Sequence, residues 1–251
     1  MSLRGVDVSG YQRDMDEGAV FAQVDFAIMK ATEGTSTVDS CCDRFYQAAR
    51  RAGILRGFYH VLTAADPVAQ ADHFVDSCLG YFGDGIPVLD VEGTGGYPND
   101  PDMACRFFDR VKERTGAVTM LYANGSCLKS ADYSPLAERG AGLWIANYYF
   151  GYDEMTWSDM DADAHMSTPY GFDFAALWQF TSSGRVAGYG PLDLDMAFMD
   201  EAAWAKYAAA SAGPAGGGDG DGAGGAHPGR AHRRTGPGGH RVHPEQHPGL
   251  S

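Results

Sequence analysis

The sequence predicts an α/β fold, namely a modified TIM-like β/α barrel with incomplete helices on its last strands. Short apolar runs alternate with helical patterns at the spacing of βα units. Eight apolar runs are present, which is the number of strands that such a barrel needs. Helical patterns lie mainly between the first six runs, so we expect the last three strands to depart from a regular barrel.

The expected strands are apolar runs bounded by turn residues. In chain order they cover residues 4–9, 25–31, 55–62, 86–92, 117–123, 143–148, 175–181 and 192–198. The expected helices cover 16–23, 40–52, 66–79, 101–115, 126–138 and 199–210, and a long loop rich in Asp and aromatic residues covers 149–173. A doubly wound open sheet is the competing architecture. It would need a glycine-rich phosphate loop after the first strand, and DVSGYQRD has a single glycine.

Composition divides the chain into a domain, residues 1–210, and a tail, residues 211–251. From Ser211 onward the chain carries 13 of its 34 glycines and 5 of its 12 prolines, with almost no large apolar residue. Such a segment cannot bury enough apolar surface to offset the entropy lost on ordering. We therefore predict a disordered tail, and we interpret its histidines as compositional bias rather than a metal site.

The charge balance argues against nucleic acid as a partner. The chain has a net charge of −14, and the tail contributes four Arg against Asp219, Asp221 and Glu245, so the domain carries −14 − 1 = −15. Phosphate neutralisation needs clustered Lys and Arg instead. No run approaches the ~18 consecutive apolar residues of a membrane-spanning helix, so no membrane insertion is expected.

Cysteine usage and the first residues bear on the compartment. The five cysteines are odd in number and form no C-x-x-C pair, which fits reduced thiols better than a disulfide framework or a cysteine-based zinc site. The segment MSLRGVDVSGYQ leads directly into a strand without the apolar region of a signal peptide. We expect synthesis in the cytoplasm without a signal peptide, and no metal or other cofactor.

Polar and aromatic residues recur where the predicted strands end, which is where a β/α barrel builds its active site. Asp7 ends the first strand and Asp90 and Glu92 end the fourth, while the last strand contributes Asp193 and Asp195. Other strand ends supply Glu33, Tyr59, Tyr122, Trp144, Tyr148, Trp178 and Gln179. Aromatic rings among carboxylates suit a carbohydrate, whose C–H faces stack on rings while its hydroxyls bond to acids.

The stretch IPVLDVEGTGG places two acids where folding gains nothing from them. Residues i and i+2 of a strand share a face, so Asp90 and Glu92 lie roughly 6 to 7 Å apart at Cα. Each charge disfavours the ionisation of the other. The plain alternative is a strand end with two solvated carboxylates.

These residues resemble glycoside hydrolase family 25, the Chalaropsis-type lysozymes. The similar segments are, in order, GVDVSGYQ, AIMKATEGTS, RRAGILRGFYHV, PVLDVE, LYAN, LWIANY and LWQFTSSGRVAGYGPLDLD, which span residues 5 to about 198. The resemblance implies a modified β/α barrel. It also implies hydrolysis of the β-1,4 bond between N-acetylmuramic acid and N-acetylglucosamine in peptidoglycan.

The resemblance also implies roles by motif position. Glu92 matches the general acid and Asp90 the carboxylate beside it, while Asp7 and Asp193 match the aspartates of the first and last strands. The family commonly has Asp-Leu-Asn where this chain has Asp-Leu-Asp, so the last-strand role could belong to Asp195 instead. The predicted substrate-binding residues are Glu33, Tyr59, Tyr122, Trp144, Tyr148, Trp178, Gln179 and Asp195.

Glycoside cleavage needs a proton for the leaving oxygen and stabilisation of an oxocarbenium-like centre. A glutamate beside an anionic aspartate in a partly dry mouth can stay protonated near neutral pH, so we expect Glu92 to act as the acid. The 2-acetamido group of the substrate can attack C1, with Asp90 orienting it. This retaining, substrate-assisted route is the hypothesis, and a direct inverting displacement is its alternative.

Structural explanations stand beside these roles. Asp7 could cap a helix or pair with Lys30, and Glu33 could bond backbone amides. His60 fits a hydrogen-bonded structural histidine, about half of the aromatic residues could be core, and Gln179 could fix a neighbouring carboxylate.

Other function classes remain open at the level of the sequence. A metal-dependent polysaccharide deacetylase could use Asp7, His60, Asp90 and Glu92 as ligands, and a wall-binding barrel could have lost catalysis. A chitinase-like glycosidase would carry further aspartates before the D-x-E motif, where GIPVL stands here. The expected partner is bacterial peptidoglycan. We expect a monomer that acts on the cell wall after release, for which a holin is one route.

Overall fold

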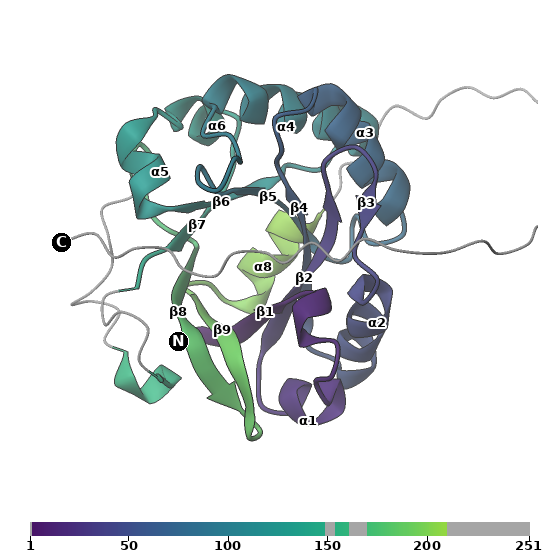
Figure 1. Ribbon diagram of the computed structural model, residues 1–251, viewed down its shortest axis with the longest axis vertical. Helices are drawn as coiled ribbons and strands as arrows, with labels where there is room; N and C mark the ends of the chain where they lie inside the picture. Colours follow the sequence, from purple (N-terminus) through teal and green to yellow (C-terminus); the bar gives the residue numbers. More distant parts are fainter. Residues whose placement is uncertain (1, 149–153, 161–169, 210–251) are drawn as a thin grey trace, which may run out of the picture. The chain divides into compact units, whose positions relative to one another are not determined.

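The computed structural model describes residues 2–148, 154–160 and 170–209. Within them, eight strands close into a ring: the sheet runs in the order β1-β9-β8-β7-β6-β5-β4-β2-β3, and β1 also pairs with β2. Figure 1 looks into this ring, with α1 to α6 around its outside and α8 across it. The predicted barrel is confirmed.

The strands follow the predicted runs most closely in the first half of the chain. They are β1 (Leu3–Val8), β2 (Phe26–Glu33), β3 (Thr37–Val38), β4 (Leu55–Val61), β5 (Ile86–Val91), β6 (Met120–Asn124), β7 (Leu143–Ala146), β8 (Leu177–Val186) and β9 (Tyr189–Ala197). From β1 through β2, β4, β5, β6 and β7 to β8, each ring strand is parallel to the next. Every residue of β5 is buried, as expected for a parallel strand covered on both faces.

The last strand departs from the regular barrel because β9 runs antiparallel to both β8 and β1. The prediction that Asp193 and Asp195 lie where the last strand ends is wrong. Asp193 is the middle residue of β9 and stands opposite Asp7 of β1. Since Asp7 lies near the carboxyl end of β1, Asp193 reaches the same rim as the carboxyl ends of the other strands, while the part of β9 before it pairs with β8 alone.

Two strand features were not predicted. The β8–β9 hairpin continues to the Val186–Tyr189 pair, through a glycine-rich segment without the apolar pattern of a strand. The second feature is β3, whose two residues pair with Thr32 and Glu33 and are too few to form a recognisable pattern.

The helices occupy the predicted positions with shifted ends. They are α1 (Glu17–Phe21), α2 (Cys42–Ala52), α3 (Pro67–Cys78), α4 (Pro101–Thr115), α5 (Gly125–Ser130), α6 (Ser134–Glu138) and α8 (Glu201–Ala208), with short 3-10 helices η1 (Gly10–Gln12) and η2 (Trp157–Asp159). Asp66 and Asp100 cap α3 and α4, each followed by a proline that fits the first helical turn. The single helix predicted over 126–138 is two helices, because the backbone is extended at Ala131.

Two apolar cores hold the barrel. The larger lies outside the ring, between the strands and the helices α1 to α6. The smaller fills the ring, where Phe26, Ile28 and Val88 meet Trp204 of α8. The Trp204 ring packs on Phe26 at 4.9 Å between centroids, so α8 closes the end of the barrel at which the parallel strands begin. A side chain at Gly5 would overlap the Phe26 ring, which explains a glycine in the middle of β1.

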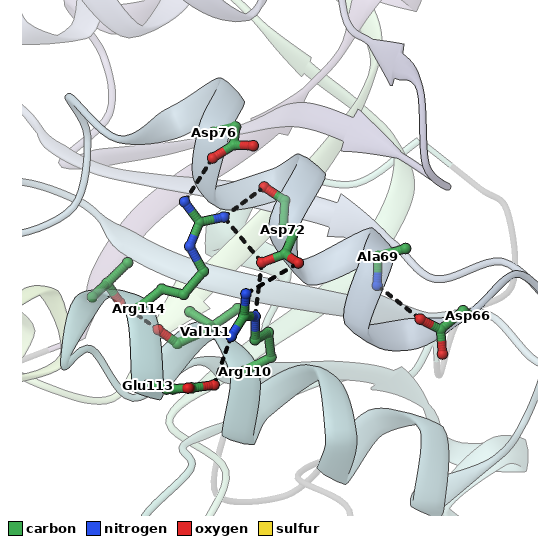
Figure 2. A network of polar contacts seen from close by, with 9 residues as sticks. Asp66, Ala69, Asp72, Asp76, Arg110, Val111, Glu113 and Arg114 are labelled. Atoms are coloured by element: carbon green, nitrogen blue, oxygen red, sulfur yellow. Dashed lines mark hydrogen bonds and ion pairs between the residues drawn. The ribbon is translucent and has the colours of Figure 1, made fainter.

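Ion pairs join α3 and α4 on the outer surface (Figure 2). Asp72 of α3 accepts hydrogen bonds from Arg110 at 2.8 Å and Arg114 at 3.0 Å, both on α4. Arg114 also reaches Asp76 at 2.7 Å, one turn further along α3. This network fixes how the two helices lie against each other over β4 and β5, and it is remote from the barrel mouth.

Two predictions fall partly or wholly on residues that the structure does not describe. The tail predicted for 211–251 lies outside the described residues, as does most of the loop predicted for 149–173, apart from 154–160 and 170–173. Among the helices that are described, none has the length and apolar character needed to cross a bilayer.

Candidate active site

The acids of the first and fourth strands come together at the rim where the parallel strands end. Asp7 is the fifth residue of β1, and its inward face also carries Leu3 and Gly5. Asp90 occupies the same face of β5 as Ile86 and Val88, and it pairs in register with Tyr122 of β6. Glu92 follows directly after β5 and is partly exposed, while Asp7 and Asp90 are buried.

Gln179 of β8 links Asp7 to two tyrosines. Its Nε2 donates to Asp7 Oδ2 at 2.6 Å, and its Oε1 accepts from the hydroxyls of Tyr122 at 2.8 Å and Tyr148 at 2.6 Å. The interpretation of Gln179 as a residue that fixes a carboxylate is confirmed. The side chain is buried, so it acts through Asp7 and the two tyrosines.

The reversed strand β9 adds two more acids, at two depths. Asp193 stands opposite Asp7 and is partly exposed, whereas Asp195 stands opposite Gly5 and is completely buried. Trp144 of β7 donates its indole N–H to Asp195 Oδ1 at 2.9 Å, and Trp157 of η2 donates to the Asp195 carbonyl at 2.9 Å. Asp193 therefore belongs to the mouth, and Asp195 to the layer beneath it.

Burial dominates the electrostatics of this mouth. Loss of water raises the pKa of Asp7, Asp90, Asp193 and Asp195 well above the usual aspartate value. The second cause in each case is another acid: Asp195 acts on Asp7, and Glu92 on Asp90. The acids of the mouth therefore keep their protons to a higher pH than isolated carboxyls do.

Asp90 keeps one buried oxygen without a donor. Within the described residues, its Oδ1 has no hydrogen-bond partner. Leaving a buried carboxylate oxygen unpaired costs about 1 to 3 kcal/mol, and more if it is charged. An oxygen of this kind at the mouth suits a donor from a bound molecule.

The peptide of Glu92 is held by two side chains, and the sequence patterns did not single out the second of them, Cys127. The Glu92 carbonyl accepts from Asn124 Nδ2 at 2.9 Å and from the Cys127 thiol at 3.1 Å. Asn124 also caps α5 by accepting from the Cys127 amide. Nothing in the spacing of a lone cysteine pointed to this contact, which depends on α5 folding back beside β5.

Glu33 forms a separate cluster with two partners. Its carboxylate accepts from Lys30 at 2.7 Å and from the Tyr97 hydroxyl at 2.9 Å. Although burial favours the neutral acid, the hydrogen bond from Lys30 lowers the pKa of Glu33. Lys30 thus pairs with Glu33 rather than Asp7, and Ser9 is the residue that caps η1, so neither structural explanation of Asp7 applies.

The predicted aromatic residues divide into two groups. Tyr59, Tyr122 and Tyr148 are partly exposed. Trp144 and Trp178 are 2% and 0% exposed, and Trp178 lies in the outer core against Phe180. A substrate contact is therefore not expected of these two tryptophans. The sequence could not show this, because a buried tryptophan and a tryptophan at an open strand end lie in similar patterns.

His60 is a structural residue. It is completely buried, and its ring nitrogens contact Thr32 at 2.7 Å and Gln70 at 3.2 Å. Burial lowers the pKa of His60 to about 3, so the ring is neutral. Over the described part of the chain, no group of three or more His, Cys, Asp or Glu residues is arranged to hold a metal ion.

Comparison with known proteins gives consistent results. The family model described as glycosyl hydrolases family 25 matches residues 6–189. An autolytic lysozyme of Clostridium acetobutylicum is 38% identical over 148 residues, covering 58% of this chain and 45% of that protein. An N,O-diacetylmuramidase of Chalaropsis sp is 30% identical over 205 residues, covering 74% of this chain and 92% of that protein.

Solved structures agree with the fold. The crystal structure of a bacterial lysozyme from Streptomyces coelicolor matches with a TM-score of 0.69 and 27% identity, covering 82% of this chain and 96% of that chain. The present chain thus spans nearly all of the Streptomyces lysozyme chain and less than half of the Clostridium protein.

Proposed function

The chain belongs to glycosyl hydrolases family 25, and from this membership we propose that it is a muramidase. It would hydrolyse the β-1,4 bond between N-acetylmuramic acid and N-acetylglucosamine in bacterial peptidoglycan. The observation that carries the proposal is the group formed by Asp7, Asp90, Glu92 and Asp193 at one rim of the barrel. The relatives whose names describe them as lysozyme or N,O-diacetylmuramidase support it.

Glu92 is assigned the role of general acid. It is the more exposed member of the Asp90–Glu92 pair, so it can reach the leaving oxygen of a bound glycan. Its neighbour Asp90 is buried, and the charge of Glu92 raises the pKa of Asp90 further. The pair therefore keeps its first proton to a higher pH than an isolated carboxyl would, which favours acid catalysis.

Asp90 is assigned the 2-acetamido group of the substrate. Its unpaired Oδ1 can accept the N–H of that amide, which would turn the amide carbonyl toward C1. Attack by this carbonyl forms the C1–O bond as the glycosidic bond breaks and Glu92 protonates the leaving oxygen. Water then opens the ring intermediate, and the configuration at C1 is retained.

Asp7, Asp193 and the exposed tyrosines complete the proposed site. Asp193 flanks the reacting sugar from β9, and Tyr59, Tyr122, Tyr148 and Glu33 line its surroundings. We further propose that the protein works on the cell wall as a monomer. Release by a holin stays a prediction.

Digestion of purified peptidoglycan tests the function. We expect new muramic acid reducing ends by mass spectrometry from the wild type. Glu92→Gln should lower the rate at least 100-fold, since general acid catalysis contributes roughly 10² to 10⁴. Glu113→Gln is the matched control, because Glu113 is an exposed residue of α4 that pairs with Arg110. Glucosamine ends would contradict the bond assignment, and a wild type that cleaves nothing would contradict the function.

The route is tested by the anomer formed first. Proton NMR of a short glycan during cleavage should detect the β-anomer before mutarotation, because the substrate-assisted route retains configuration. An α-anomer as the first product would replace this route by direct displacement through water.

A further inference from the structure

Beneath the mouth, one buried carboxylate oxygen lacks a donor. Asp195 accepts from Trp144 through Oδ1, but Oδ2 has no hydrogen-bond partner among the described residues. The residue is completely buried, so water cannot supply the missing donor from bulk solvent. An unpaired buried oxygen of this kind requires an explanation.

The side chain that faces Asp195 is another acid. In the β1–β9 ladder Asp195 stands opposite Gly5 and Asp193 opposite Asp7, so Asp7 and Asp195 are diagonal neighbours on the inner face. Their side chains lie in hydrogen-bond contact. Two ionised carboxylates offer only acceptors, so this contact becomes a hydrogen bond only when one of them carries a proton.

Each acid receives one N–H donor from a neutral side chain, which leaves one oxygen of each for the other acid. Asp195 receives the Trp144 indole N–H, which stabilises its anion. Asp7 receives the Gln179 amide on Oδ2 and keeps its second oxygen for a proton. We propose that Asp7 and Asp195 share one proton, with Asp7 as donor and Asp195 Oδ2 as acceptor, and that Asp195 is a positioning residue for Asp7.

The surroundings favour one negative charge on this pair rather than two. Burial is the largest cause that raises the pKa of both groups, and each group is the other's neighbour in charge or hydrogen bonding. The groups that act most strongly on the pair are Asp193 and Glu92, both acidic, and the neutral Gln179 and Trp144. Asp7 also acts on the carboxyl of Asp90 and on the hydroxyls of Tyr59, Tyr122 and Tyr148, none of which carries a positive charge. Lys30 acts on Asp90, and it pairs with Glu33.

The shared proton has a consequence for the proposed muramidase, on which this step rests. A protonated Asp7 places no second full charge beside Asp90 and Glu92, although it still accepts from Gln179. The proton also holds the Asp7 carboxyl between Gln179 of β8 and Asp195 of β9. A continuous series of hydrogen bonds then runs from Tyr122 through Gln179, Asp7 and Asp195 to Trp144. Asp195 would act on catalysis only through this series of hydrogen bonds.

Carbon-13 NMR of protein labelled at the aspartate carboxyl carbons tests the pair without substrate. In Asp195→Asn the new amide keeps an acceptor for Trp144 and offers an N–H donor to Asp7. We expect the Asp7 carboxyl to ionise at least tenfold more readily, so its pKa falls by at least one. The pH profile of peptidoglycan cleavage by Asp195→Asn should also differ in shape from the wild-type profile, rather than only in overall rate.

Two further variants sharpen the test. Asp193→Asn removes a neighbouring acid opposite Asp7 without replacing the Asp195 contact, so it should shift the Asp7 titration less. Asp7→Asn gives the reciprocal measurement: it should make Asp195 ionise more readily, and it serves if Asp195→Asn does not fold. An unchanged Asp7 titration in Asp195→Asn, or an equal shift in Asp193→Asn, would overturn the shared proton. Because the titration needs no cleavage, a protein that is inactive on peptidoglycan would refute the muramidase and leave this inference standing.

Discussion

At the scale of single residues, the position of Glu92 depends on two side chains that bind its carbonyl and on the glycine that follows it in the sequence. Cys127 and Asn124 bind its carbonyl, and Gly93 packs directly against the Cys127 sulfur. A β-carbon at Gly93 would overlap that sulfur and press on Asn99. The absence of a side chain at residue 93 thus allows Cys127 to hold the backbone that carries the proposed acid.

Gly93→Ala should therefore lower kcat at least tenfold on peptidoglycan, while Gly95→Ala should change it less than threefold. Both glycines have left-handed backbones, with φ of 66° and 64°, so both variants bear a similar conformational cost of about 1 kcal/mol. Only the first also displaces Cys127, because the nearest atom to a β-carbon at Gly95 is 3.9 Å away. Kinetics with thermal unfolding as a control separate the two effects, and equal losses of kcat would refute this role of Gly93.

Single residues were predictable where a local pattern carries the signal. The D-x-E pattern at a strand end located Asp90 and Glu92 at the rim, since side chains alternate with a period of two. Trp178 was misjudged as a substrate contact, because one residue along a strand decides between the lumen and the outer core. Tyr97, Cys127 and Trp157 were missed, since their contacts join segments that no local pattern relates.

At the scale of elements, one aspartate ties three segments together at the amino end of the barrel. Asp84, in the turn before β5, accepts from Arg56 of β4 at 2.8 Å, from Arg50 of α2 at 3.0 Å and from the Tyr46 hydroxyl at 2.8 Å. The hydrogen bonds from Arg56 lower the pKa of Asp84 to about 2. The same group in the unfolded chain titrates near 3.8.

Asp84→Asn should reduce the free energy of unfolding at pH 7 by about 2 kcal/mol, from a depression of nearly two pH units. A depressed acid stabilises the fold above its unfolded value, and this contribution disappears as the pH falls from about 4 to 2. Urea unfolding of wild type and variant should therefore converge over that window. Asp76→Asn is the control, as its single ion pair is mostly exposed and worth at most ~1 kcal/mol. A difference that persists at pH 2 would contradict the assignment.

Elements were predicted in number and type better than in direction. Apolar runs identify parallel strands because both faces of each strand are buried. The direction of β9 could not be predicted from its composition, since a glycine-rich hairpin and a short crossover leave similar patterns. Asp193 was still assigned to the correct rim, but for a reason that does not hold in the structure, and Asp195 lies beneath that rim.

At the scale of the whole molecule, the barrel is held by an outer core under the helices and an inner core closed by α8. The eight-strand count and the family resemblance were enough to predict this arrangement. The inner layers were not predictable, since they arise only when strands distant in sequence meet: Asp7 and Gln179, or Trp144 and Asp195. Long-range register, rather than local propensity, builds the candidate site.

The ring closes where its first strand meets its last, and Asp7 faces Asp193 across that closure. During synthesis on the ribosome, a growing chain would therefore already carry Asp90 and Glu92 while the opposite wall of the mouth was still missing. The rim gains its final acids only after β9 has emerged and paired with β1. The proposed lytic activity would thus begin with completion of the domain, and translation that stops before β9 would yield no working fragment.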